Sequence, residues 1–254
     1  MWKTILLEKP EECIAVLTIN RPEAMNALNS RVLGDLESAL AVIRADEAIT
    51  VLIVTGSGSK AFVAGADIAE MAGMNAEQGR AFSAMGHRVM AALENLDQVS
   101  IAAVNGFALG GGNELALACD LRIAADTASF GQPEVGLGIP AGFGGTQRLP
   151  RMIGASRAKM LLYTGDRIKA DEAFRIGLAD MIVPAADLMA EAMKLAGKIC
   201  KQRKFAVQQS KKCVQKGLES SFEAGSSYEA QAFGMCFATD DQKKAMQAFL
   251  TKKK

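Results

Sequence analysis

The sequence predicts an α/β protein in which strands alternate with helices, followed by a helical C-terminal region. Three observations support this prediction. A pattern of apolar strand, loop and amphipathic helix occurs three times before residue 120. The loops rich in glycine and small residues all follow strands, as expected for stacked β/α turns. From Ala185 onward nearly the whole chain has helical character and is rich in Met and Ala.

The first 50 residues are predicted to form two strands and one helix. A strand begins almost at the N-terminus, and a second one covers Cys13–Asn20, where β-forming residues alternate with other apolar residues. Asn29 or Ser30 can cap a helix that continues to about Ala45, because apolar residues recur there at helical spacing.

The next predicted elements surround the glycine-rich loops. Val51–Thr55 and Ile101–Val104 are expected to be short buried strands. A helix that begins after three consecutive glycines should run through Glu114 to Ala118. The amphipathic helix between the two strands has an apolar face formed by Phe82, Met85, Val89, Leu93 and Leu96.

The second half of the chain is predicted to be mainly helical. Short strands are expected at Leu121–Ala125, Ser129-Phe130 and Asp180–Val183, and helices at Ala155–Tyr163 and Ala170–Ile176. The C-terminal helices have weak breaks near Arg203, Gly217 and Thr239. Their methionines are typical of core filling, with packing between subunits as the alternative.

Composition excludes several classes of protein. The 254 residues are 50% apolar and carry a formal net charge of +1, which predicts a folded chain without the basic surface that nucleic acids require. No apolar run is long enough to span a membrane, and the N-terminus does not resemble a signal peptide. The N-terminus therefore predicts a cytoplasmic protein. The five cysteines are odd in number and contain no C-x-x-C pair, so we expect reduced, mostly buried thiols. Whether a transit peptide has been removed is left open.

Several common catalytic motifs are absent or lack the structural context that they require. Gly136 to Ala141 matches a dinucleotide-binding pattern in its letters, but no long strand precedes it and Pro140 removes an amide that phosphates would need. The only histidine, His87, lies in an amphipathic helix far from any serine in a glycine-rich loop, which argues against Ser-His catalysis. One histidine and scattered cysteines give no set of metal ligands, although a magnesium site made of carboxylates alone stays open.

Two carboxylates beside glycine-rich loops form the candidate site. Glu114 follows the glycines of one loop, and Glu134 precedes another loop that runs from Gly136 to Gly145. A third loop, Ala64 to Asp67, can also present bare amides. These parts would supply an acid, a base and an oxyanion hole. The structural alternative is that Glu114 only starts a helix and Glu134 only caps a turn.

Four stretches extend this hypothesis. In chain order they are Asn20-Arg-Pro-Glu-Ala-Met-Asn-Ala-Leu28, Ala64-Gly-Ala-Asp-Ile68, Ala103-Val-Asn-Gly-Phe-Ala-Leu-Gly-Gly-Gly-Asn-Glu114, and Phe130-Gly-Gln-Pro-Glu134 through Gly144-Gly-Thr-Gln-Arg148. Together they resemble the enoyl-CoA hydratase (crotonase) family over nearly the whole chain. The set is specific for the fold and less so for the reaction, since the superfamily includes isomerases, hydrolases, dehalogenases and decarboxylases.

The resemblance implies a fold and an assembly. The fold is a spiral of ββα turns, which residues 1–184 would form around the active site. Residues 185–254 would be a helical region that belongs to the same structural unit and completes homotrimers, usually paired as hexamers.

The resemblance also implies a reaction and a site. Glu114 and Glu134 would flank the double bond of a short-chain enoyl-CoA such as crotonyl-CoA, with the amides of Ala66 and Gly111 on the thioester oxygen. Water would be added reversibly, as in fatty-acid β-oxidation or butyrate- and butanol-type metabolism, without a cofactor other than the substrate's coenzyme A. The positions that match the family's substrate and coenzyme A site are Ala24, Met25, Ala27, Ala64, Ala66, Asp67, Ile68, Ala69, Gly110, Gly111 and Gly142.

Two positions depart from the family pattern. The family often reads Ile-x-Pro-Gly after the second acid, whereas this chain reads Ile139-Pro-Ala-Gly142. Glu23 stands where many relatives carry a lysine near the coenzyme. The alternatives to a hydratase are an isomerase of the same fold and a non-catalytic member that binds acyl-CoA or RNA. Both acids of the hydratases are present, which favours hydration, and the near-neutral charge argues against RNA.

Overall fold

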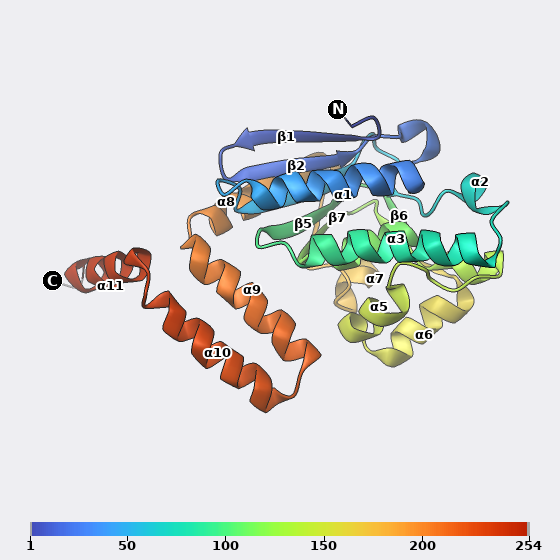
Figure 1. Cartoon of the computed structure of the whole chain (residues 1–254). Helices are drawn as coiled ribbons and strands as arrows, with labels where there is room; N and C mark the ends of the chain where they lie inside the picture. Colours follow the sequence, from blue (N-terminus) through green and yellow to red (C-terminus); the bar gives the residue numbers. More distant parts are fainter. Residues whose placement is uncertain (1, 253–254) are drawn as a thin grey trace. The chain divides into compact units, whose positions relative to one another are not determined.

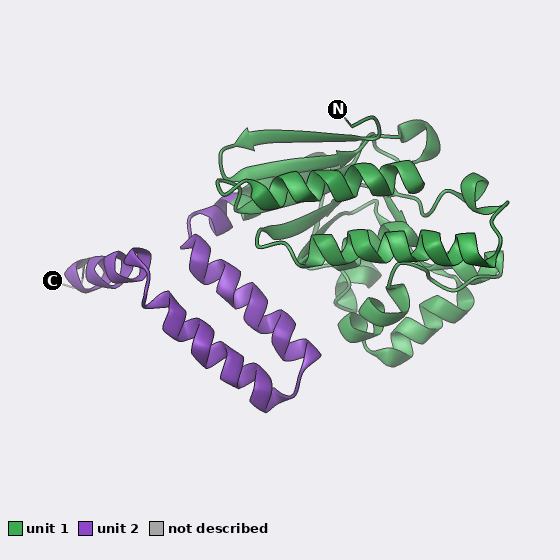
Figure 2. Ribbon diagram, viewed as in Figure 1, with its two compact units in different colours: residues 1–196 green, residues 197–254 purple. Residues whose placement is uncertain are grey.

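The structure, a computed structural model, describes residues 2–252. It divides into two compact units, residues 1–196 and 197–254 (Figure 2). The roles expected for residues 1–184 and 185–254 stay a prediction, and each compact unit is described by itself.

The larger sheet of the first unit has six strands. In spatial order they are β1 (Ile5–Glu11), β2 (Ile14–Ile19), β3 (Val51–Gly56), β5 (Val99–Val104), β7 (Leu121–Ala125) and β10 (Met181–Val183). β1 pairs antiparallel with β2, and every later pair is parallel. All residues of β3 and β5 are buried, as expected for parallel strands covered on both faces.

The smaller sheet has four strands. Their order is β4 (Ala61–Val63), β6 (Phe107–Leu109), β8 (Ser129–Gly131) and β9 (Arg167–Lys169), of which only β9 pairs antiparallel. Successive strands alternate between the two sheets: β3 and β4, β5 and β6, then β7 and β8. Helices follow each of these pairs, which confirms the predicted spiral of ββα turns (Figure 1).

Helices surround the sheets of the first unit. The α-helices are α1 (Ser30–Ala45), α2 (Ile68–Met71), α3 (Ala76–Glu94), α4 (Gly111–Ala118), α5 (Gly145–Ile153), α6 (Ala155–Thr164), α7 (Ala170–Arg175) and α8 (Leu188–Cys200), the last of which extends into the second unit. Short 3₁₀ helices are η1 (Pro22–Ala24), η2 (Pro133–Leu137) and η3 (Ala185–Asp187).

The two long helices α1 and α3 lie side by side (Figure 1). Asn29 caps α1 by accepting from the amide of Val32, and Asn75 with Gln78 forms a capping box at α3. Both helix starts are therefore fixed by side chains next to the predicted apolar faces.

The second unit contains α9 (Lys204–Glu219), α10 (Phe222–Cys236) and α11 (Asp240–Lys252). The helix break expected near Gly217 lies three to four residues later, because Gly217 is inside α9 and Ser221 caps α10. A β-carbon at Gly225 would lie 3.0 Å from the Cα of Gly217, so these glycines let α9 and α10 approach closely. No described helix has the length and apolar character needed to cross a membrane.

Candidate active site

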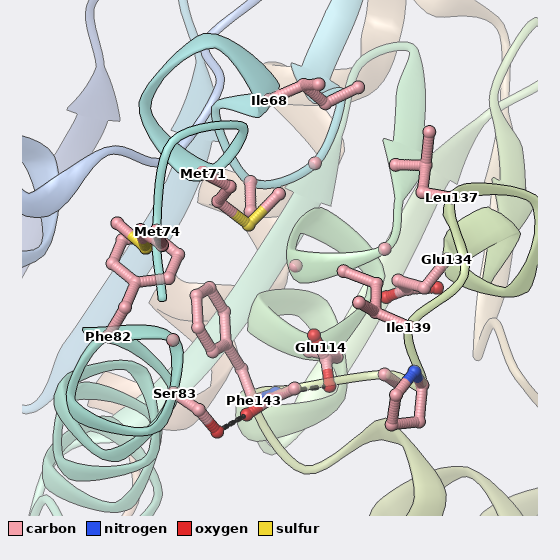
Figure 3. Close-up of a pocket in the computed structure, with 18 of the residues that line it drawn as sticks. Ile68, Met71, Met74, Phe82, Ser83, Glu114, Glu134, Leu137, Ile139 and Phe143 are labelled. Carbon is pink, nitrogen blue, oxygen red and sulfur yellow. Dashed lines mark hydrogen bonds between the residues drawn. The ribbon is translucent and has the colours of Figure 1, made fainter. Parts of the chain in front are cut away.

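A cavity of about 520 Å³ lies in the first unit. Its walls come from the loop after β4, from α2 and α3, from the start of α4, and from η2 with the loop behind it (Figure 3). The larger apolar side chains that line it are Ile68, Met71, Met74, Phe82, Leu137, Ile139 and Phe143. Its polar and titratable residues are Asn75, Ser83, His87, Glu114 and Glu134. An apolar cavity of this size with a few polar groups is typical of a site for a small ligand.

The glycines at the start of α4 bring two segments of the cavity wall together. Gly110 has a φ of +50°, which lets β6 turn directly into α4. A β-carbon at Gly112 would overlap the carbonyl oxygen of Val63 at the end of β4. The helix start therefore packs tightly on β4, and a β-carbon at Gly111 would lie only 3.4 Å from the amide nitrogen of Ala66.

This packing places two backbone donors beside the cavity. Within residues 2–252, the N–H groups of Ala66 and Gly111 have no hydrogen-bond partner, and both residues line the cavity. Gly111 is the first residue of α4, where the helix leaves amides unpaired and favours negative charge. The pair can donate to one oxygen that gains negative charge during a reaction.

Glu114 is buried at the inner side of the cavity, with 1% of its surface exposed. Its Oε1 atom accepts hydrogen bonds from the amides of Phe143 at 2.7 Å and Gly145 at 2.6 Å. Burial, with a smaller contribution from Glu134, raises the pKa of Glu114 to about 7, against the opposing effect of these amides and Arg148. A carboxyl group with this pKa can both take up and release a proton near neutral pH.

Glu134 reaches the same cavity from η2. Burial raises its pKa above the ordinary value. When the side-chain nitrogen of Gln132 is oriented toward Glu134, this nitrogen donates to the two carboxylate oxygens of Glu134 at 2.9 and 3.1 Å. A β-carbon at Gly110 would lie 3.0 Å from Oε1 of Glu134, so this glycine leaves room for the carboxylate beside the two amides.

The structure therefore brings together four predicted groups. Two carboxyl groups with raised pKa values and two unpaired amides border one largely apolar cavity. Such a set can transfer protons at one part of a substrate while it stabilises negative charge at another.

The other predicted substrate positions fall into two groups. Ala64, Ile68, Gly110 and Gly142 line the cavity. The remaining predicted positions lie outside its lining: Ala24, Met25, Ala27, Asp67 and Ala69.

The two segments expected at the coenzyme nevertheless lie next to each other. The amide of Leu28 donates to Gly65 O at 2.8 Å, and the amide of Asp67 donates to Leu28 O at 2.9 Å. Arg21 connects the same segments, because its guanidinium donates to the Asp67 carboxylate and to the Ala27 carbonyl. Their roles at the coenzyme stay a prediction.

Sequence reasoning missed several side chains that shape the cavity. Phe82 was predicted on an apolar helix face, and it does pack inward, but onto Phe143 with ring centroids 5.4 Å apart. His87, predicted only as part of the α3 helix, lines the cavity too. A signal was available for Ser83 and His87, because they lie four residues apart and therefore on the same face of one helix. In the part of the chain that the structure describes, no group of three or more His, Cys, Asp or Glu side chains could hold a metal ion.

Known proteins are similar to this chain in sequence and in fold. The model of the enoyl-CoA hydratase/isomerase family matches residues 9–254. A crotonyl-CoA hydratase of Syntrophomonas wolfei is 54% identical over 100% of this chain and 97% of its own length. A short-chain-enoyl-CoA hydratase of Clostridium acetobutylicum is 50% identical over 98% of this chain and 95% of its own. The crystal structure of an enoyl-CoA hydratase from Bacillus anthracis superposes with a TM-score of 0.96 at 42% identity, covering 98% of this chain and 97% of that one.

Proposed function

The chain belongs to the enoyl-CoA hydratase/isomerase family, and from this premise we propose that it catalyses the reversible addition of water to short-chain trans-2-enoyl-CoA thioesters. It would be a hydro-lyase, equally a 3-hydroxyacyl-CoA dehydratase in the reverse direction. The observation that carries the proposal is the pair of buried carboxyl groups that shares one cavity with two unpaired amides.

The proposed reaction uses each group for one task. In the hydration direction Glu114 takes a proton from the water that attacks Cβ, and Glu134 delivers a proton to Cα. The carbonyl oxygen of the thioester gains enolate charge, which the amides of Ala66 and Gly111 stabilise. Losing one such donor typically raises the barrier by about 3 kcal/mol, and backbone amides are held in place by the fold.

The two carboxyl groups suit this proton transfer because their pKa values are raised together. Like charges in one cavity resist joint ionisation, so the pair tends to hold one proton between its members. One member is then available as base and the other as acid at neutral pH. The apparent pKa values of catalysis would belong to the pair.

The phenylalanine side chains on one side of the cavity support the proposal that the substrate has a short acyl chain. The Phe143 ring lies between Phe82 and Glu114 (Figure 3), and only 3% of the residue is exposed. A β-carbon at Gly86, one turn after Phe82 on α3, would overlap the ring. The ring is thus fixed between α3 and Glu114, where it restricts the space beyond the proton-transfer site.

Hydration is favoured over isomerisation by the presence of both acids. Moving a double bond along the acyl chain requires proton transfer but no water, whereas here two carboxyl groups can act on one water and one double bond. Incorporation of oxygen from labelled water into the product distinguishes the two reactions. A product without the label would support the isomerase.

The test of the proposed function is hydration of crotonyl-CoA by the purified chain without added cofactor. We expect loss of the enoyl thioester absorbance and unchanged activity in EDTA, since the proposed mechanism uses only side chains and backbone amides. Activity that EDTA removes and a divalent ion restores would contradict the metal-free mechanism. No hydration of enoyl-CoA of any chain length would contradict the function itself.

We also propose a homotrimer or a hexamer formed by two trimers, in the cytoplasm. The second unit supports the assembly, since Phe222, Leu218 and Phe233 are 92%, 76% and 66% exposed. The absence of a C-x-x-C spacing among the cysteines fits a reducing compartment. The substrate's coenzyme A would be the only coenzyme involved.

A further inference from the structure

The turn that carries the amides for Glu114 is held at two of its carbonyl groups. The hydroxyl of Ser83, on α3, donates to Gly142 O at 2.6 Å, as Figure 3 shows. The guanidinium of Arg148, on α5, donates through Nη1 to Phe143 O at 3.1 Å. The same residue, Phe143, uses its N–H for Glu114 and its carbonyl for Arg148.

Arg148 is in turn fixed by a carboxylate at the end of α3. Its Nη2 and Nε atoms donate to Oε2 of Glu94 at 2.6 and 3.2 Å. The Arg148 side chain is 16% exposed and that of Glu94 is 40% exposed. A β-carbon at Gly144 would overlap Nη1 of Arg148, so the guanidinium lies directly against the turn. Three of its nitrogens thus have defined partners on two sides.

We infer that Arg148, held by Glu94, is a positioning residue for the hydration reaction. It keeps the turn of residues 143–145 in the conformation that directs two amides onto one oxygen of Glu114. The inference rests on the proposed function, because it assigns Glu114 as the base. It adds a residue that does not line the cavity and acts through the turn.

The second effect of Arg148 is electrostatic. Its positive charge favours the ionised form of Glu114 and so opposes the effect of burial on the pKa of that carboxyl group. The other charged or titratable groups around Glu114 are Glu134 from η2, Glu94 at the end of α3, and His87, which lines the cavity from α3. Arg148 and Glu94 carry opposite charges, so their removal should move the titration of Glu114 in opposite directions.

A purely structural role predicts a different result. If the Arg148–Glu94 pair only joins α5 to α3, removing either partner should lower the melting temperature while kcat per folded molecule and its pH dependence stay unchanged. The sign of the pH shift therefore separates positioning and charge from simple stabilisation.

The experiment compares pH profiles of kcat/KM for crotonyl-CoA hydration in Arg148→Gln, Arg148→Lys and Glu94→Gln. For Arg148→Gln we expect the acid limb to move to higher pH by a fraction of a pH unit, because Arg148 makes a smaller contribution to the pKa of Glu114 than burial and the two amides do. We expect its kcat to fall by about 10–100-fold, since a small displacement of a catalytic group is costly. Arg148→Lys keeps the positive charge, so its acid limb should stay at the wild-type pH. Its kcat should still fall, because a lysine cannot make all the hydrogen bonds of the guanidinium group. Glu94→Gln should move the limb to lower pH, by less because Glu94 is partly exposed.

Arg151→Gln is the matched control, because it removes an exposed arginine one turn further along α5. It should leave the profile unchanged. The same pH profiles are also measured in variants that carry His87→Gln as well. If the shift of the acid limb vanishes there, the shift is due to His87 and the inference is wrong. The inference would also be wrong if the acid limb of kcat/KM lay at the wild-type pH in both Arg148→Gln and Glu94→Gln. If Arg148→Gln does not fold, the Arg148→Lys and Glu94→Gln profiles decide. A wild-type chain without hydratase activity would instead reject the proposed function.

Discussion

The amide of Gly145 donates to Oε1 of Glu114 at 2.6 Å, and the amide of Phe143 donates to the same oxygen at 2.7 Å. Oε2 of Glu114 accepts neither of these bonds and is free to meet water. The turn thus fixes the orientation of the carboxylate without using the oxygen that would take the proton in the proposed reaction. Even with two donors, burial dominates and the pKa of Glu114 stays raised to about 7.

This raised pKa predicts how stability depends on pH. A carboxyl group whose pKa is higher in the folded state stabilises the fold below its ordinary pKa, and that contribution is lost as the pH rises from about 4.5 to about 7. Glu114→Gln removes this loss and can still accept from both amides. The free energy of unfolding of Glu114→Gln minus that of wild type should therefore be larger at pH 8 than at pH 5, by up to about 3 kcal/mol.

Denaturant unfolding of both proteins at pH 5 and pH 8 measures this difference. Glu172→Gln is the control, because Arg175 holds the pKa of the Glu172 carboxyl below its usual range and the side chain is 38% exposed. Its stability relative to wild type should stay constant across that interval. An equal offset at both pH values for Glu114→Gln would show that Glu114 is ionised in the folded protein throughout.

The exposed apolar side chains of the second unit predict an oligomer. Phe222, Phe233, Phe249 and Leu250 are each more than 60% exposed in the single chain, which is unusual for a soluble monomer. Light scattering should give the mass of a trimer or a hexamer at micromolar concentration. A stable monomer would contradict the prediction. Phe222→Asp should weaken the assembly, whereas a change at the exposed Glu219 should not.

Much of the fold was predictable because its elements carry local signals. The α1 helix has a capping residue at Asn29 and an apolar stripe, and the buried strands β3 and β5 read as short apolar runs. The alternation of strands between two sheets has no such signal, since β4, β6 and β8 have only three residues each. Gly217 misled the prediction because a glycine in a helix can serve close packing as well as termination.

The candidate site was predictable in its polar parts and not in its shape. Glu114 and Glu134 stand beside glycine-rich sequences, and the family motifs place the amides of Ala66 and Gly111. The contact between Phe82 and Phe143 joins residues 61 positions apart, and nothing local indicates it. The same holds for the Glu94–Arg148 pair, which depends on how α3 and α5 pack.

Phe143 predicts a change in chain-length preference. Phe143→Ala should open the space beyond Glu114, so that kcat/KM rises for longer enoyl-CoA substrates relative to crotonyl-CoA. Removing a buried phenylalanine ring also costs about 3–5 kcal/mol of stability. Leu40→Ala in α1 is the control for that cost, because Leu40 is buried and does not line the cavity. The same ratio of kcat/KM values across chain lengths in Phe143→Ala and wild type would reject the assignment.

The last prediction concerns the two acids. Glu114→Gln and Glu134→Gln keep the size and most of the hydrogen bonding of each side chain but remove the transferable proton, so each should lower kcat by about 10²–10⁴. The dissociation constant of acyl-CoA should change little, because the amides of Ala66 and Gly111 and the coenzyme contacts remain. The loss then lies in the transition state and not in uniform binding.

The double variant makes this prediction specific. If both carboxyl groups act on one water and one double bond, as proposed, Glu114→Gln/Glu134→Gln should lose far less activity than the product of the two single losses. A structural role would instead lower the melting temperature and leave kcat per folded molecule near wild type. Measuring kcat, the acyl-CoA dissociation constant and the melting temperature for all three variants separates these outcomes. A single variant with near-normal kcat would remove that residue from the mechanism, since a group that transfers a proton in the rate-limiting step cannot be replaced by an amide without loss.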